Sequence, residues 1–154
     1  MDSRPIKRIV VATDFSEGSD AAMERAFGLA RALDASIELV HVLDTALLMS
    51  PTALGGLPLF DPRALMDQVD TALAARAAKA TEAGLVCRSK RLDGYPAREI
   101  LAHARETHAD LIVVGTHGRT GFAHVVMGSV AGRVVQRAPC PVLVIPPERG
   151  AGET

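Results

Sequence analysis

Glycine residues cluster in one segment near the C-terminus, where their spacing suits the binding of a phosphate chain. The segment begins at Gly115, includes Gly118 and ends at Gly128-Ser129, where a helix is expected to start. A Cβ atom would hold the backbone away from a ligand, so glycine at these positions lets backbone N–H groups approach phosphate oxygens. The helix start adds unpaired amides and the positive end of the helix dipole. The segment therefore predicts an anion site.

The same segment also has a simpler interpretation. Glycine serves turns, and Ser129 is a common type of helix N-cap. Hydrogen bonds to charged acceptors contribute roughly 1.5 to 3 kcal/mol each, so three or four donors could supply most of the about 8 kcal/mol that micromolar affinity needs. His117 and Arg119, within the segment, are either phosphate contacts or solvated loop residues. From the residues alone, both interpretations stay open.

Short apolar runs alternate with helical patterns along the chain. Strands are expected at Arg8 to Ala12, Ser36 to Val42, Leu85 to Leu92, Leu111 to Val114 and Val142 to Ile145. Helices are expected at about Ser19 to Leu33, Pro62 to Ala83, Pro96 to His108 and Ser129 to Arg137, with Asp61 as the N-cap before Pro62. Leu43 to Phe60 is expected to be irregular, either as a lid over a site or as a flexible excursion.

This order predicts an α/β fold with a single doubly wound, five-stranded, mostly parallel sheet of order 3-2-1-4-5 and helices on both faces. The winding reverses between the first and fourth strands, and ligands of such sheets bind beyond the carboxyl ends of the strands there. The loops after Ala12 and Val114 should then face each other. Asp14 would lie opposite the glycine segment, as a ligand contact or as an ordinary helix cap.

Composition narrows the class of protein. The 154 residues, 48% of them hydrophobic, predict one domain over residues 1–154 that is ordered from about residue 5 to residue 147. Lys and Arg number 17 against 18 Asp and Glu, so no charge excess favours nucleic acid or a membrane as partner. Without a signal peptide or a membrane span, the chain is expected in the cytoplasm. The Cys and His residues do not have the spacing of metal ligands, so no metal site is predicted.

The spacing of Gly115, two residues, Gly118, nine residues and Gly128-Ser129 resembles the ATP-binding signature of the universal stress protein family. The resemblance extends from about Lys7 to Pro146 and includes three further segments: Val11 to Ser16, His41 to Asp44 and Pro139 to Val144. It implies that ATP is bound, with Mg²⁺ carried by the nucleotide. It implies a site formed by Ala12, Asp14, Val42, Gly115, Gly118, Gly128, Ser129 and Val130.

The last expected strand, Val142 to Ile145, would form an apolar edge of the sheet. Such an edge could pair with a second copy, although Pro141 and Pro146 could instead blunt it. The family resemblance also implies a homodimer. The expected function is an ATP-dependent switch in stress survival that an unidentified protein partner reads.

Two other functions remain as alternatives. The first is a slow ATP hydrolase or an enzyme that phosphorylates itself. Hydrolysis should be slow because the chain has no GxxxxGK[ST] motif and no lysine in the glycine segment. The second is RNA binding, since Gly118 to Gly121 matches the GXXG loop of KH domains. That loop joins two helices in KH domains but follows a predicted strand here, so RNA binding is the remoter alternative.

Overall fold

The computed structural model describes residues 4–48, 61–116 and 127–147. In this part of the chain, one sheet contains β1 (Arg8–Ala12), β2 (Ser36–Asp44), β3 (Cys87–Gly94), β4 (Leu111–Gly115) and β5 (Val142–Ile145). All neighbouring strands are parallel, and their order is β3-β2-β1-β4-β5. The predicted fold class and strand order are confirmed.

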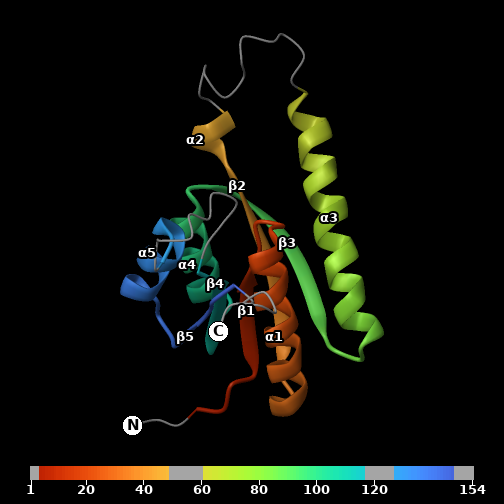
Figure 1. The fold of residues 1–154 in the computed structure, drawn as a ribbon, viewed down its shortest axis with the longest axis vertical. Helices are drawn as coiled ribbons and strands as arrows, with labels where there is room; N and C mark the ends of the chain where they lie inside the picture. The colour runs from red at the N-terminus through yellow and green to blue at the C-terminus, as the bar shows by residue number, and fades with distance from the viewer. Residues whose placement is uncertain (1–3, 49–60, 117–126, 148–154) are drawn as a thin grey trace, which may run out of the picture.

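Helices cover both faces of the sheet (Figure 1). One face carries α1 (Glu17–Leu33) and α3 (Pro62–Glu82), and the other carries α4 (Pro96–Glu106) and α5 (Ser129–Arg137). In β1, Ile9 and Val11 pack under α1 and α3, whereas Val10 packs under α4 and α5. A strand buried on both faces needs an uninterrupted apolar run, and β1 has one. None of the helices in the described residues is long and apolar enough to cross a membrane.

The starts of the two helices on the first face follow from their capping residues. The Ser16 Oγ accepts the Ser19 N–H at 3.2 Å, so α1 begins at Glu17, two residues before its predicted start. Asp61 accepts the Arg63 N–H at 2.9 Å and precedes the proline that opens α3, as predicted.

The prediction that Leu43 to Phe60 is irregular is wrong for its first six residues. β2 continues through Asp44, and a short helix, α2 (Thr45–Leu48), follows it. Leu43 is buried in the core, and the pairing of β2 with β3 extends to Asp44 opposite Gly94. The Asp44 carboxylate accepts the Ala46 N–H at 3.0 Å at the start of the helical turn. Residues 49–60, on which the predicted lid depends, lie outside the described residues.

β3 begins and ends two residues later than predicted. The Leu85 N–H still bonds the Ala80 carbonyl at the exit of α3, whereas Asp93 and Gly94 pair with the end of β2. α4 ends at Glu106 rather than at His108, because His108 has a φ of 51°, outside the helical region. These shifts leave the topology unchanged.

Candidate functional site

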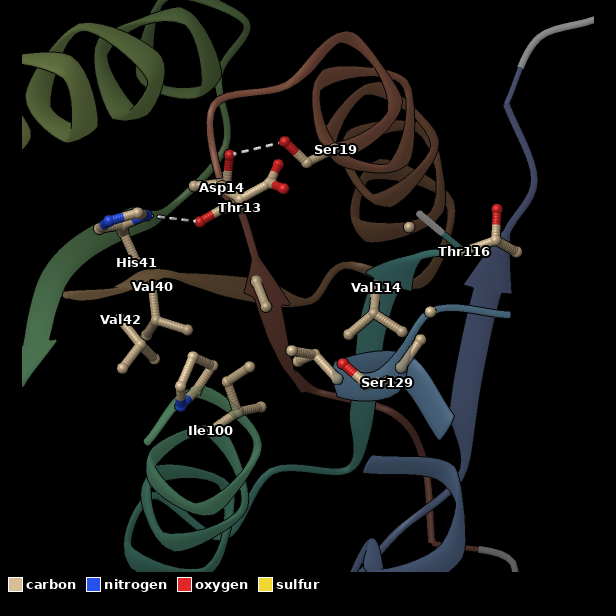
Figure 2. A pocket seen from close by; sticks show the side chains of 16 residues that line it. Thr13, Asp14, Ser19, Val40, His41, Val42, Ile100, Val114, Thr116 and Ser129 are labelled. Carbon is tan, nitrogen blue, oxygen red and sulfur yellow. Dashed lines mark hydrogen bonds between the residues drawn. The ribbon is translucent and has the colours of Figure 1, made fainter. Parts of the chain in front are cut away.

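A pocket of about 230 Å³ lies at the carboxyl ends of β1, β2 and β4, where the winding of the sheet reverses. The first turns of α1, α4 and α5 complete its lining (Figure 2). Seven of the eight predicted site residues line it: Ala12, Asp14, Val42, Gly115, Gly128, Ser129 and Val130. Gly118 lies outside the described residues, as do His117, Arg119 and the GXXG segment that suggested RNA binding.

One side of the pocket is apolar. Val40 and Val42 come from β2, and Pro96 and Ile100 come from the first turns of α4. Figure 2 shows Val40, Val42 and Ile100 gathered on one side, away from Thr116 and Ser129. An apolar wall of this kind can pack against the flat face of an aromatic group.

The start of α5 forms a second side of the pocket. Gly128 is the N-cap of α5, and its N–H donates to the Thr116 carbonyl at 2.6 Å. Gly128 therefore leaves space for a ligand because it has no side chain, but its N–H is already bonded. The sequence could not show which of these two properties the glycine provides. The Gly132 N–H makes a bond to the Gly128 carbonyl at 2.9 Å, so the amides of residues 129–131 precede the first helical hydrogen bond. Those amides form the positive end of the helix dipole at the pocket.

A network of hydroxyl groups fixes the turn between β1 and α1. Ser19 Oγ donates its one proton to the Ser16 carbonyl at 2.9 Å. In the hydrogen bond between Ser19 Oγ and Thr13 Oγ1, at 3.0 Å, Thr13 is therefore the donor. Thr13 Oγ1 in turn accepts the Phe15 N–H at 3.0 Å. Asp14 accepts hydrogen bonds from both the N–H and the hydroxyl of Ser16. Ser16 is the cap of α1, so the interpretation of Asp14 as an ordinary helix cap is wrong.

The charges around the pocket separate two kinds of ligand group. Asp14 repels anions but accepts hydrogen bonds from hydroxyl or amino groups, whereas the start of α5 attracts anions. None of the described residues that line the pocket is Lys or Arg. In the described part of the chain, no group of three or more His, Cys, Asp or Glu could hold a metal ion. The geometry suits a ligand with an aromatic part, hydroxyl groups and an anionic end.

The sequence analysis missed part of the lining. The missed residues are Thr13, Ser19, Val40, His41, Pro96, Ile100, Val114, Thr116 and Ala131. Val40 could have been found, because it lies two residues before Val42 in β2, and residues two apart share a face of a strand. Pro96 and Ile100 could not, because their place depends on how α4 lies across the sheet.

Comparison with known proteins identifies the family. The model of the universal stress protein family matches residues 5–146. This chain belongs to that family. A universal stress protein of Methanocaldococcus jannaschii is 37% identical over 139 residues, which cover 90% of this chain and 81% of that protein. The predicted family resemblance is thereby confirmed.

Solved structures of universal stress proteins share the fold. The universal stress protein UspA from Lactobacillus plantarum superposes with a TM-score of 0.77 at 26% identity, over 93% of this chain and 99% of that chain. A universal stress protein solved in complex with cAMP superposes with a TM-score of 0.69 at 25% identity, over 94% of this chain and 100% of that chain.

Proposed function

We propose that this universal stress protein binds ATP in the pocket and acts as a cytoplasmic nucleotide-dependent switch. The observation that carries the proposal is the apolar wall that lies across one pocket from the start of α5. The base would pack against Val42 and Ile100, and Asp14 would accept hydrogen bonds from the ribose hydroxyls. The phosphates would bind the amides of Ser129 and Val130. The related structure in complex with cAMP supports an adenine nucleotide as the ligand.

Mg²⁺ would reach this site with the nucleotide. Proteins usually hold Mg²⁺ through substrate phosphates and one or two carboxylates rather than through a complete protein cage. Asp14 is the carboxylate of the described lining, so it is the residue that could share the ion with the phosphates. The pocket therefore suits a nucleotide that arrives with Mg²⁺ already bound.

Binding is favoured over catalysis as the main activity. Phosphoryl transfer needs a cationic clamp on the transferring group and a positioned base. The described pocket lining has no Lys or Arg to provide the clamp.

Gly115 and Ser129, which bracket the glycine segment, both line the pocket. ATP would therefore bind both ends of that segment, and a protein partner would read the resulting change.

We also propose that two copies pair through β5 to form a homodimer. The two edges of the sheet differ in character. β3 carries Arg88, Lys90 and Arg91, charges that discourage pairing with another strand, whereas β5 reads Val-Leu-Val-Ile. Leu143 of β5 is 37% exposed, and a second copy of β5 would cover it.

Calorimetric titration of ATP with Mg²⁺ tests the proposed site. Wild-type protein should bind saturably, and Gly128→Asp should abolish binding because it adds a side chain and a like charge at the phosphate position. Gly132→Asp is the matched control: it makes the same change one turn later in α5, where an added Cβ meets nothing within 4 Å. Binding by wild type and by Gly132→Asp, with no binding by Gly128→Asp, supports the site. Absence of wild-type binding would reject the proposal.

A further inference from the structure

The Phe15 ring contacts side chains from two elements that are distant from each other in sequence. The imidazole of His41, on β2, stacks on it with ring centroids 4.4 Å apart and planes 21° apart. The guanidinium carbon of Arg76, on α3, lies over the ring at 4.8 Å from its centroid. Aromatic stacking and cation–π contact both stabilise such an arrangement. We refer to His41, Phe15 and Arg76 as the stacking clamp.

Each partner of Phe15 is itself held in place. The Nδ1 of His41 bonds the Thr13 carbonyl at 2.9 Å, and because a carbonyl oxygen only accepts, this nitrogen carries the proton. The Nε and Nη2 atoms of Arg76 bond the two carboxylate oxygens of Asp20 at 2.8 and 3.1 Å. A bidentate pair of this kind fixes the plane of the guanidinium as well as its position. The clamp therefore joins β2, the β1–α1 turn, α1 and α3.

Phe15 needs this support because of its backbone. Its φ is 65°, in the left-handed region that bulky residues rarely adopt. Such a conformation persists only where the surroundings impose it. The Thr13 hydroxyl holds the Phe15 N–H, and the clamp holds the ring. In sequence, Asp14 lies between two residues that are held by these contacts. The Thr13 carbonyl before it bonds His41, and the Phe15 ring after it contacts Arg76.

We propose that the stacking clamp positions Asp14 for the nucleoside and makes Arg76, on α3, a positioning residue of the nucleotide site. This inference rests on the proposed ATP binding. Without the guanidinium, Phe15 is less restrained in its left-handed conformation, and the adjacent Asp14 carboxylate keeps its two bonds from Ser16 but follows a less restrained backbone. By linkage, a nucleotide that requires this position of Asp14 also favours the docked position of α3.

The direct test measures ATP affinity in Arg76→Met, which keeps an apolar stem and removes the guanidinium. The dissociation constant should rise about tenfold, which corresponds to about 1.4 kcal/mol. The control, Lys79→Met, removes an exposed charge from the same helix and should bind as wild type does.

A double-mutant cycle then asks whether Arg76 acts through Asp14. In an Asp14→Asn background, Arg76→Met should add little further loss of ATP affinity, because the positioned group is already altered. Losses that simply add would assign Arg76 a general structural role and overturn the inference, as would wild-type affinity in Arg76→Met. Absence of ATP binding by wild type rejects the proposed function instead, so the two failures are distinguishable.

A second variant covers the case in which Arg76→Met does not fold. Phe15→Ala removes the ring but keeps a Cβ, so a φ of 65° stays unfavourable while the contacts that hold it are gone. If the ring positions Asp14, this variant binds ATP about tenfold more weakly, again about 1.4 kcal/mol. Wild-type affinity in Phe15→Ala would overturn the inference.

Discussion

A Cβ atom at Gly115 would lie 3.3 Å from the carbonyl oxygen of Gly18, which places the end of β4 against the first turn of α1. Both residues belong to elements that line the pocket. The neighbour is backbone, which cannot rotate away as a flexible side chain would. Glycine at 115 therefore serves the packing of the fold in addition to any contact with a ligand.

Gly115→Ala should lower both stability and ATP affinity. An added methyl group in a packed contact costs roughly 1 kcal/mol, so the melting temperature should fall by about 2 to 4 °C for a chain of this size. Gly28→Ala in α1 is the control of opposite sign, because a Cβ there meets nothing within 4 Å and alanine favours a helix. Thermal unfolding of both variants measures the difference. Equal melting temperatures for Gly115→Ala and Gly28→Ala would show that α1 shifts at Gly18 to accommodate the added methyl group.

ATP hydrolysis should be slow. The chain has no GxxxxGK[ST] motif, and the glycine segment has no lysine to stabilise the charge that develops on the transferring phosphoryl group. Release of inorganic phosphate from saturating ATP with Mg²⁺ should give a turnover below about 0.01 per second. A turnover near the enzyme median of about 10 per second would replace the switch with an ATPase.

The dimer should depend on the backbone of β5. The carbonyls of Pro141 and Ile145 accept hydrogen bonds from the Ile112 and Thr116 N–H groups, on the β4 side. Backbone groups alternate along a strand, so the N–H of Val144 points to the open edge. Val144→Pro removes that N–H and should shift the mass measured by light scattering from twice 16.2 kDa to 16.2 kDa.

Val144→Ala is the matched control for the dimer, because it trims the side chain and keeps the N–H. It should remain dimeric. If Val144→Pro is also dimeric and its far-ultraviolet circular dichroism matches wild type, the copies do not pair through this edge. The proposed interface would then be incorrect.

The Cys87 thiol should be unreactive at neutral pH. Burial, with a smaller contribution from the Glu38 carboxylate, raises the pKa of Cys87 from its ordinary value of 9.0 to about 11. The thiolate, which reacts with iodoacetamide, is then scarce below that pH. Labelling at pH 8, followed by mass spectrometry, should be much slower than for the unfolded chain. Equal rates would contradict the burial of the thiol.

The same shift predicts a pH dependence of stability. Because the folded state holds the protonated thiol more tightly than the unfolded state does, the stabilisation is complete below pH 9.0 and is lost as the pH rises toward about 11. Urea unfolding of wild type and Cys87→Ser over this range isolates the contribution, since serine does not titrate there. Parallel curves for the two proteins would exclude it.

The sheet topology could be predicted because its signals are local and strong. Leu111 to Val114 and Val142 to Ile145 are uninterrupted apolar runs, and the crossover rule allows few ways to connect them. The pocket followed from the reversal of the winding, which brings the loops after Ala12 and Val114 together. Residue chemistry and topology indicated Asp14, the glycines and Ser129, and the family signature then added Ala12, Val42 and Val130.

What could not be predicted depends on contacts between distant segments. The end of β2 looked irregular because Leu43 and Asp44 form a strand only when paired with Asp93 and Gly94. The stacking clamp requires Arg76 to reach Phe15 across 61 positions of sequence, and no local pattern indicates that. The bond of the Gly128 N–H to the Thr116 carbonyl likewise joins residues twelve positions apart, and no local pattern indicates it.

The most direct test of the account is to follow backbone amide signals by nuclear magnetic resonance while ATP with Mg²⁺ is added. A second pocket, of about 480 Å³, lies at the amino ends of β1 to β3 and serves as an internal reference; its lining includes Lys7, Arg31 and Val86. The account predicts saturable shifts centred on Asp14, Val42, Gly115, Ser129 and Val130, with little change at the second pocket. Saturable shifts centred on the second pocket, or none at all, would contradict it.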